Sequence, residues 1–483
     1  MKKRIQLIGI FLIITNSILA QSYEDCNFNP FYATDYIVSG NFSQNDSNDK
    51  LINDVVMLRY NNVIDKFKLY TFTSNGNGDR TLNQNYNFNN YDLENVNGRM
   101  VKGDFDNDGH IDDFILINKT GTSSMRFDLF KSDGAQQPSF IQSSPYSLNG
   151  YDPDKITGRV VSGDFDNDGF WDDIAAFYDY GNGETRIHTF LSNGNTFSYQ
   201  YSTGWWNSTG YTASRITDRV VSGDFDKDGK VDDIAAFYDY GGGNTRIHVW
   251  LSNGSGFSYQ SSVGWWVSNS STDFTASKIS KRVLSLNIDR KGENYDDIVT
   301  FYKTSSGKTK MRVFISDGTS FNYQPFLWES ALNPDQISGK IVEYDSRTSG
   351  ITQGKPSDII GFSNQFYPTR YHFWKAKKGV FNTNIEFSSP YYCKSKSANV
   401  GGDIKEISAY PNPTESITTI EIPKLLIDDI SRIEVHNLYG RLVFSNMVKS
   451  SSVKIDLSKQ KPGVYIVKVI GRKSSNVLKI VKD

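Results

Sequence analysis

The chain has only two cysteines and five histidines among its 483 residues, and its charges nearly cancel. Lys and Arg total 52 and Asp and Glu total 54, so the net charge of -2 gives no electrostatic reason to expect a nucleic acid or an anionic membrane as partner. The sequence also lacks a nucleophile elbow, a phosphate-binding loop and an HExxH motif. We therefore expect no catalytic residues, and a binding protein rather than an enzyme.

Long apolar runs are absent after the first twenty residues, so we expect no membrane span in the mature chain. Residues 1–20 have the layout of a secretory signal peptide, with basic residues first, then an apolar stretch and small residues before Gln21. No cysteine follows Ala20 directly, which argues against a lipoprotein signal. The mature protein is expected to be exported through the periplasm and then secreted or attached to the outer membrane at the cell surface.

Aromatic residues are plentiful, at 14% of the chain, and so are glycines, of which there are 39. This balance favours strands joined by tight turns. Residues 21–393 contain six copies of a unit whose first strands begin near Tyr36, Arg99, Arg159, Arg219, Arg282 and Lys340. Each copy reads as four strands separated by Gly and Asn turns, the pattern of a propeller blade. We expect an all-β propeller of four-stranded antiparallel blades, with six blades favoured and seven possible.

The two cysteines, Cys26 and Cys393, lie at the two ends of this repeated region. In a closed ring of blades they would lie side by side. Export would expose them to an oxidising compartment, so we predict a Cys26–Cys393 disulfide that joins the first and last blades. Two unpaired buried thiols are the alternative.

Three of the six copies carry a loop crowded with aspartates, with carboxylates at positions one, three, five and nine and glycine at position six. This spacing suits a hard cation with six or seven oxygen ligands, position seven contributing its backbone carbonyl. The predicted calcium ligands are Asp104, Asp106, Asp108, His110 and Asp112; Asp164, Asp166, Asp168, Phe170 and Asp172; and Asp224, Asp226, Asp228, Lys230 and Asp232. A bound dication would remove the repulsion between these carboxylates. We expect about three calcium ions, each stabilising one loop. The alternative is that each loop is an acidic solvated turn without a metal ion. In the third copy, either Asp172 or Asp173 could be the last ligand.

The stretch GDFDNDGFWDDIAAFYDYG, which begins at Gly163, resembles the FG-GAP/VCBS repeat family, including integrin-type β-propellers. The resemblance is specific in copies two to four and looser in the others. It implies calcium in the acidic loops and a binding or adhesive role, without naming a ligand. Two departures are that such propellers commonly have seven blades and that this loop carries a second aspartate before the strand.

Aromatic residues recur at positions that could form a binding surface. Aromatic faces beside polar groups suit stacking on sugar rings, and their repetition would add avidity. The candidate ligand-binding residues are Trp205, Trp206, Trp265, Trp266, Tyr180 and Tyr240. Packing between blades is the alternative role for the tryptophans.

Arginine and histidine also recur two residues apart in the third strand of the unit. Arg186 and His188 are repeated one and three copies later, and Arg126 and Arg312 are expected to match the arginine alone. Alternation along a strand puts both side chains on one face. We expect these arginines to pair with carboxylates of the neighbouring blade rather than with a ligand.

The C-terminal part of the chain differs from the repeats. Residues 394–408 are small and polar, which predicts a linker, and residues 409–483 alternate in strands with Gly and Pro turns, which predicts a small immunoglobulin-like β-sandwich. YPNP from Tyr410, NLYGRLV from Asn437 and PGVYIVKV from Pro462 resemble the type A sorting domain of the type IX secretion system of Bacteroidota. The resemblance implies recognition by the outer-membrane translocon and removal of the tail. A permanent adhesive domain is the alternative.

The sequence as a whole predicts an exported calcium-binding propeller that acts as a surface or secreted binding or adhesion protein, with a glycan or a matrix component as ligand. An extracellular polysaccharide lyase or hydrolase built on a propeller is the alternative from another class.

Overall fold

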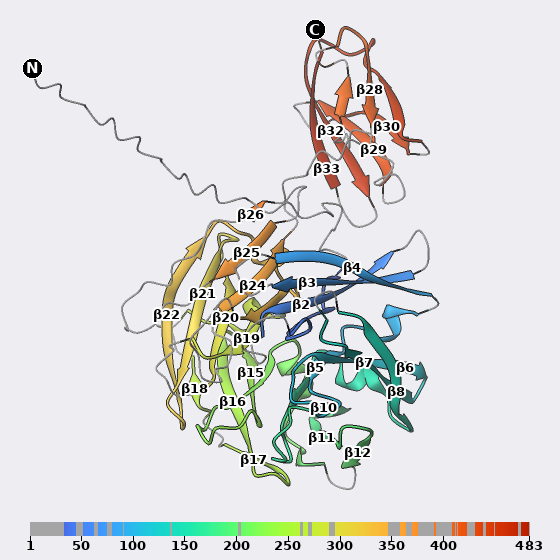
Figure 1. Ribbon diagram of the computed structural model, residues 1–483. Helices are drawn as coiled ribbons and strands as arrows, with labels where there is room; N and C mark the ends of the chain where they lie inside the picture. Colours follow the sequence, from blue (N-terminus) through green and yellow to red (C-terminus); the bar gives the residue numbers. More distant parts are fainter. Residues whose placement is uncertain are drawn as a thin grey trace, which may run out of the picture. The chain divides into compact units, whose positions relative to one another are not determined.

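The structure is a computed structural model of the chain (Figure 1). It describes residues 33–44, 52–61, 66–74, 80–89, 91–135, 138–200, 204–260, 264–268, 273–288, 295–345, 358–363, 370–374, 391–392, 408–410, 412, 414–422, 430–437, 441–448, 450–471 and 475–482. The signal peptide, Cys26, Cys393 and almost all of the expected linker lie outside these residues. The chain divides into two compact units, Met1–Lys396 and Ser397–Asp483.

In the part of the first unit that the structure describes, six antiparallel sheets follow one another along the chain, and we number these blades 1 to 6. Blade 1 contains β1 (Ile37–Gly40), β2 (Asp54–Asn61), β3 (Lys66–Ser74) and β4 (Arg80–Asn89); blade 2 contains β5 (Met100–Gly103), β6 (Asp113–Gly121), β7 (Ser124–Ser132) and β8 (Phe140–Asn149). Blade 3 contains β9 (Val160–Gly163), β10 (Asp173–Gly181), β11 (Glu184–Ser192), β12 (Phe197–Gln200) and β13 (Trp206–Ser208). Blade 4 contains β14 (Val220–Gly223), β15 (Asp233–Gly241), β16 (Asn244–Ser252), β17 (Phe257–Tyr259) and β18 (Trp266–Val267).

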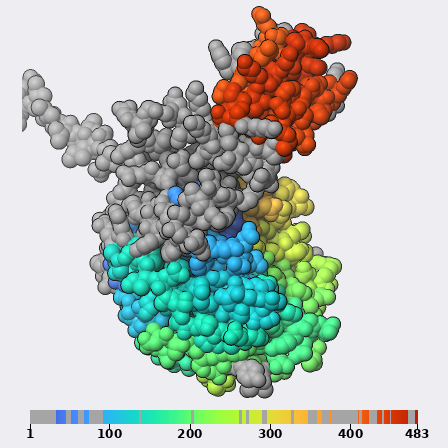
Figure 2. Space-filling view, turned by 90° about the vertical axis from the view of Figure 1, so that its right-hand side faces the viewer, coloured from blue at the N-terminus to red at the C-terminus, as the bar shows by residue number. Residues whose placement is uncertain are grey.

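Blade 5 contains β19 (Val283–Leu286), β20 (Asp297–Lys303), β21 (Thr309–Ser316) and β22 (Phe321–Ser330), and blade 6 contains β23 (Ile341–Tyr344), β24 (Asp358–Ser363), β25 (Arg370–Trp374) and β26 (Tyr391–Tyr392). In blades 3 and 4 the outermost position is shared by two short strands, because β12 and β13 both pair with β11, and β17 and β18 both pair with β16. The all-β propeller with six blades is confirmed. The space-filling view shows the residues of consecutive blades side by side (Figure 2).

The ring of blades closes through the backbone. The innermost strands of neighbouring blades lie next to one another all the way round, including β23 beside β1. Asp345 of blade 6 donates its N–H to the carbonyl of Ile52 in blade 1 at 2.7 Å, and Asp35 donates to the carbonyl of Gly339 at 2.9 Å. Blade 6 is thus bonded directly to blade 1, whatever the state of the two cysteines.

Shortly before the inner strand of every blade, two residues earlier in the chain, lies a residue with a left-handed backbone conformation. These residues are Asp35, Gly98, Gly158, Asp218, Lys281 and Gly339, with φ between 60 and 73°. Hydrogen bonds of 2.7 to 2.9 Å connect consecutive members from Gly158 through Asp218, Lys281 and Gly339 to Asp35. Glycine adopts this conformation without strain, which explains three of the six positions.

Buried arginines connect blades 2 to 5 each to the next blade. Arg219 follows the 3₁₀ turn Ala213–Ile216 and donates to the carbonyls of Arg215 and Phe237 at 2.7 and 3.2 Å, and to Ser280 Oγ of the next blade at 2.9 Å. Arg99, Arg159 and Arg282 bond in the same pattern. In blade 6 the role passes to Lys340, whose Nζ reaches Thr34 Oγ1 of blade 1 at 3.4 Å.

We expect Arg219→Ala to lower the free energy of unfolding by roughly 3 kcal/mol, because it leaves buried carbonyls without donors and opens a cavity. The control is Arg215→Ala, which removes an exposed side chain from the same turn and should cost less than about 0.5 kcal/mol. Chemical unfolding in calcium-containing buffer measures both. Equal midpoints for the two variants would contradict the structural role of the buried arginine.

The blades pack through apolar side chains on both sheet faces. Ile174, Ala175, Ala176 and Phe177 of β10 are all fully buried, as expected for a strand enclosed by two neighbouring blades. Phe177 meets Trp250 of blade 4 with ring centroids 4.8 Å apart. Each blade therefore depends on its neighbours for its core.

The second unit is a β-sandwich, as predicted. One sheet contains β27 (Ser408–Tyr410), β28 (Ile417–Glu421) and β31 (Ser452–Asp456), and the other contains β30 (Leu442–Met447), β29 (Ile430–Asn437), β32 (Gly463–Gly471) and β33 (Ser475–Lys482). Its core includes Ile420 and Ile455 from the first sheet and Ile433 and Val467 from the second. This unit has its own hydrophobic core.

Candidate functional site

The three acidic loops connect the first and second strands of blades 2, 3 and 4, and they share one backbone conformation. Glycine at position six has a φ of 94, 101 and 94° in the three loops, and the residue at position four is also left-handed. In blade 3 the N–H of Gly169 donates to Asp164 Oδ2 at 3.1 Å and that of Phe170 donates to Asp168 Oδ1 at 3.0 Å. The expected sharp turn at position six is present.

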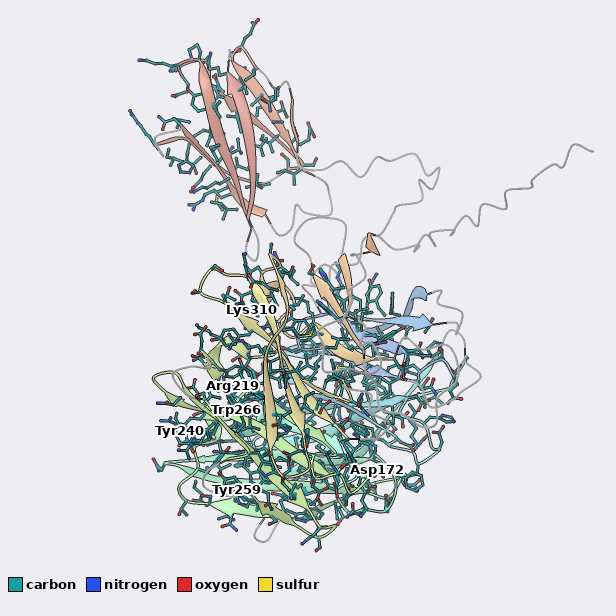
Figure 3. All side chains as sticks on the ribbon, turned by 90° about the vertical axis from the view of Figure 1, so that its left-hand side faces the viewer. Asp172, Arg219, Tyr240, Tyr259, Trp266 and Lys310 are labelled. Atoms are coloured by element: carbon teal, nitrogen blue, oxygen red, sulfur yellow. The ribbon has the colours of Figure 1, made fainter. Side chains whose placement is uncertain are left out.

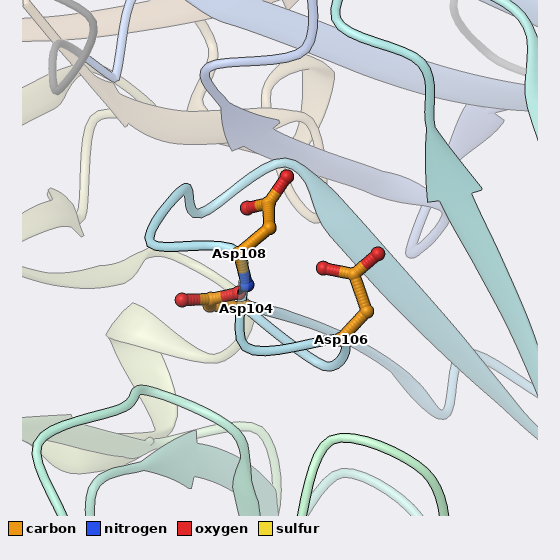
Figure 4. Close-up of side chains that lie close together, drawn as sticks. All are labelled: Asp104, Asp106 and Asp108. Atoms are coloured by element: carbon orange, nitrogen blue, oxygen red, sulfur yellow. Dashed lines mark hydrogen bonds between the residues drawn. The ribbon is translucent and has the colours of Figure 1, made fainter.

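The carboxylates of each loop converge. In blades 2 and 4 the aspartates at positions one, three and five each offer an oxygen within 4.8 Å of the others. Figure 4 shows the three that come from the loop of blade 2, Asp104, Asp106 and Asp108. In blade 3 the converging group is Asp164, Asp166 and Asp173. Oxygens gathered at this separation can coordinate one hard cation.

Buried carboxylate oxygens without hydrogen-bond partners provide a second, independent observation. Asp172 and Asp232, at position nine, are almost fully buried, yet Oδ1 of each lacks a partner. Oδ1 of Asp106 and Oδ1 of Asp164 are also buried and have no hydrogen-bond partner. Leaving a charged oxygen buried and unpaired is costly, and a cation in the loop would offset this cost.

The electrostatics agree with this geometry. Burial, together with the nearby carboxylates of Asp108 and Asp106, raises the pKa of Asp112 to about 8. Burial and neighbouring aspartates likewise raise the pKa of Asp172 and of Asp232 to about 7. Without a cation, these loops therefore resist full ionisation near neutral pH.

The second aspartate of the DD pair has a structural role. Asp173 Oδ1 accepts from Ser192 N at 2.8 Å and its Oδ2 accepts from Asp166 N at 3.0 Å. Asp233 ties the loop of blade 4 to its third strand in the same way. In blade 3 the unpartnered oxygen belongs to Asp172, so this residue fits the last ligand position better than Asp173, although Asp173 lies in the converging group. In blade 2 the order is reversed, because the buried oxygen without a hydrogen-bond partner there is Oδ2 of Asp113, the second aspartate of the pair.

Each acidic loop is also a junction between blades. Asp164 N donates to the carbonyl of Val231 in blade 4 at 3.0 Å, and Ser252 Oγ donates to the carbonyl of Phe165 at 2.9 Å. With its amide turned toward the carboxylate, Asn167 donates to Asp232 Oδ2 at 2.9 Å. An ion in one loop would thus stiffen the contact with the next blade.

The four candidate tryptophans lie in the seams between blades. Trp206 has ring centroids 5.4 Å from Trp250 and 5.3 Å from Tyr211, and Trp266 lies 4.9 Å from Phe314. Trp205 packs on Phe257 and Trp265 on Phe321, each at 5.5 Å. These contacts favour the packing role over exposed stacking surfaces.

Tyr180 and Tyr240, by contrast, are exposed at 41% and 42%. The guanidinium groups of Arg186 and Arg246 lie over their rings, each 4.8 Å from the centroid. We call these pairs, one at the hairpin of blade 3 and one at that of blade 4, the tyrosine platforms. Figure 3 shows Tyr240 at the margin of the propeller, well separated from Asp172.

A buried histidine supports each platform. His188 Nε2 lies 3.1 Å from Tyr180 Oη, and its Nδ1 lies 3.1 Å from Tyr199 Oη. His248 makes the equivalent contact with Tyr240 at 3.2 Å. Burial, with a smaller effect of the adjacent arginine, lowers the pKa of both histidines to about 4, so they are neutral at physiological pH.

We expect acid to destabilise the protein through these histidines. Their folded-state pKa lies below the ordinary value, so their contribution to stability is complete above about pH 6.5 and is lost as the pH falls toward 4. Between pH 7 and 4.5 the native protein should lose roughly 4 kcal/mol more than a His188→Gln/His248→Gln variant. Unfolding free energies at the two pH values measure this. Equal losses of unfolding free energy in the native protein and in the variant would contradict this prediction.

The predicted match of Arg312 to the repeated arginine is wrong. Arg312 lies opposite Thr300, as His248 lies opposite Ala236, so it occupies the position of the histidine. The arginine position is filled by Lys310 in blade 5. The predicted pairing across blades is also wrong for Arg186, whose Nη2 pairs with Glu184 on its own strand at 2.9 Å.

Comparison with known proteins identifies the second unit. Residues 408–483 match the family described as "Secretion system C-terminal sorting domain". The chain is therefore handled by type IX secretion and exported to the cell surface or released, as predicted. No curated protein matches the chain. Among the described residues, no helix is long and apolar enough to cross a membrane.

Solved structures similar to the chain include propellers. AofleA from Arthrobotrys oligospora is 10% identical over 74% of this chain and 88% of that chain, with a TM-score of 0.40. The Aleuria aurantia lectin, described as a six-bladed β-propeller that recognises fucose, is 10% identical over 71% and 93%, with a TM-score of 0.39. A putative 6-phosphogluconolactonase from Bacteroides uniformis is 12% identical over 80% and 95%, with a TM-score of 0.36. Sequence identities and TM-scores this low specify neither the ligand nor the activity of this chain.

Proposed function

We propose that the exported propeller is a calcium-stabilised, non-enzymatic protein that binds glycans at the cell surface or in the medium. The observation that carries the proposal is the duplicated platform: Tyr180 and Tyr240 expose their rings in neighbouring blades, each beside an arginine in the same geometry. An exposed aromatic face next to a hydrogen-bond donor suits a sugar ring, which has both apolar faces and hydroxyl groups. Two equivalent sites on one rigid scaffold add avidity.

Calcium belongs to this proposal as a structural ion. The unpartnered oxygens of Asp172 and Asp232 and the converging carboxylates of blades 2 to 4 fit an oxygen-binding dication. His110, Phe170 and Lys230 hold position seven, where each donates its N–H to the aspartate at position five and could offer its carbonyl to the ion. This arrangement supports assignment of the blades to the FG-GAP/VCBS repeat type.

A binding role accounts for the remaining polar groups better than catalysis does. The buried histidines of blades 3 and 4 are neutral and contact tyrosine hydroxyls, and the second aspartate of each DD pair, Asp173 or Asp233, accepts from the backbone of the acidic loop. The proposed Cys26–Cys393 disulfide would add a covalent closure to a ring that hydrogen bonds already close.

The platforms are tested by replacing the tyrosines. Tyr180→Ala and Tyr240→Ala should each lower glycan affinity about tenfold, the value of one stacking contact, and the double variant should show no measurable binding. Ile141→Ala is the control, because it removes another exposed apolar side chain, 67% exposed, from blade 2. A glycan array followed by calorimetry on the full chain measures binding. Unchanged binding by the double variant, or release of shortened sugar products by the native protein, would overturn the proposal.

A further inference from the structure

Position four of the loop between the first and second strands carries an amide side chain in three consecutive blades. The residue is Gln44 in blade 1, Asn107 in blade 2 and Asn167 in blade 3, with φ of 41, 58 and 65°. The loop of blade 1 has this amide although it lacks the aspartate triplet of the other two. A role in a metal site of the same loop therefore does not explain why the amide recurs.

Each of these amides reaches forward to the next blade. The acceptor is in every case Oδ2 of the aspartate at position nine. The pairs are Gln44 with Asp112 at 3.2 Å, Asn107 with Asp172 at 2.9 Å and Asn167 with Asp232 at 2.9 Å. The two asparagines have their amide nitrogens turned toward the carboxylates, because the opposite orientation would set oxygen against oxygen.

In blades 3 and 4 the carboxylate at position nine thus has one oxygen held from the preceding blade. The other oxygen, Oδ1 of Asp172 or of Asp232, is buried and has no hydrogen-bond partner. A hydrogen bond to a metal-binding carboxylate commonly orients it for coordination. The amide of the preceding blade can therefore fix the direction in which the unpartnered oxygen meets a cation.

The receiving blade leaves room for the amide. The hairpin between the third and fourth strands has Gly194 in blade 3 and Gly254 in blade 4. A β-carbon at these positions would lie 3.0 Å from the side chain of Asn107 and 3.1 Å from that of Asn167. Gly254 also donates its N–H to the amide oxygen of Asn167 at 3.2 Å. The next blade thus holds the Asn167 amide through both its oxygen and its nitrogen.

From these contacts, and resting on the proposed calcium sites, we infer that Asn107 and Asn167 are positioning residues for the calcium site of the following blade rather than of their own. Each holds one oxygen of Asp172 or Asp232 so that the other oxygen can coordinate the ion. Two blades then complete each site. The series of amides ends in blade 4, where position four is Lys227.

The test uses two forms of the full chain that each keep one intact acidic loop, in blade 3 or in blade 4. In the other two loops the aspartates at positions three and five become asparagine. The changes are Asp106→Asn, Asp108→Asn, Asp226→Asn and Asp228→Asn for the blade 3 form, and Asp106→Asn, Asp108→Asn, Asp166→Asn and Asp168→Asn for the blade 4 form. Calorimetric titration with calcium chloride measures the dissociation constant of the remaining site.

Glycine is then placed at position four, because it adopts the left-handed conformation and removes the amide. Asn107→Gly should weaken calcium binding about tenfold in the blade 3 form and leave the blade 4 form unchanged. Asn167→Gly should weaken binding about tenfold in the blade 4 form and leave the blade 3 form unchanged, although Asn167 lies in the blade 3 loop. A general weakening of the loop would instead lower the affinity of the variant's own site.

Asn182→Gly is the matched control, because Asn182 is an exposed asparagine with a left-handed backbone in a hairpin of blade 3, and it should change neither affinity. The two position-four variants are also titrated in the otherwise native chain, where each should take up about three ions, one of them about tenfold more weakly. Unchanged affinities, or a loss at the variant's own site, would overturn the inference while the calcium sites stand. No calcium uptake by the native chain would overturn the proposed calcium sites themselves.

Discussion

Removal of calcium is expected to lower the free energy of unfolding of the propeller by roughly 8 kcal/mol. Three sites that are each held at about a hundred times their dissociation constant contribute about 2.7 kcal/mol apiece. The physical cause is the cluster of buried carboxylates in blades 2 to 4, several of which have an unpartnered oxygen. Thermal unfolding in excess calcium and in excess EGTA measures the difference, which should exceed about 10 °C.

Single-loop variants separate a metal effect from a general loss of packing. Asp166→Asn should remove about a third of the calcium-dependent stability, because it weakens one of three loops. In EGTA the same variant should be no less stable than the native protein, since it removes one of several mutually repelling carboxylates. Glu94→Gln, at an exposed acid outside the loops, is the control and should leave the stability unchanged both in calcium and in EGTA. Identical melting of the native protein in calcium and in EGTA would contradict the metal assignment.

Deletion of residues 409–483 is expected to abolish export beyond the periplasm. These residues carry the match to the sorting domain and form a unit with its own core. Because the blades close on one another through Asp345 and Ile52, the propeller should still fold without the tail. Cell fractionation should find the truncated protein in the periplasm and the native protein at the surface or in the medium.

The control for this deletion is the Tyr180→Ala/Tyr240→Ala variant, which changes the proposed ligand surface and leaves the tail intact. It should be exported as the native protein is. Undiminished surface delivery of the truncated protein would show that the propeller itself carries the export signal.

The repeat made the architecture predictable from the sequence. A period of about sixty residues, with Gly and Asn turns between apolar strands, is a local property of the chain, so six blades of four antiparallel strands could be expected before any coordinates. The left-handed glycine at position six of each acidic loop was predictable for the same reason.

Contacts between blades were harder to predict from the sequence. They depend on which side chains of two repeats, about sixty residues apart in the chain, meet in space. Arg312 appeared to match the repeated arginine by type, but the pairing register places it at the histidine position. The tryptophans were candidates for a ligand surface, yet Trp266 is enclosed by Phe274 and Phe314. Composition identifies an aromatic residue, but only packing shows whether its face is exposed.

The role of the buried arginine before the inner strand of blades 2 to 5 was also not predicted. Arg219 and its equivalents were visible as the first residue of every repeat in blades 2 to 5. Their regular spacing was the available signal, since an arginine kept at a strand start beside apolar residues must find several acceptors when buried. The acceptors are the carbonyls of a preceding 3₁₀ turn and a hydroxyl of the next blade, which the linear sequence does not reveal.

The most direct test of the account is the number of calcium ions that the purified chain takes up. Calorimetric titration of chelator-treated protein should find about three ions per native chain and about two for a variant with Asp166→Asn and Asp168→Asn in the loop of blade 3. Uptake of no calcium, or the same number of ions by both proteins, would contradict the claim that these loops enclose a divalent cation.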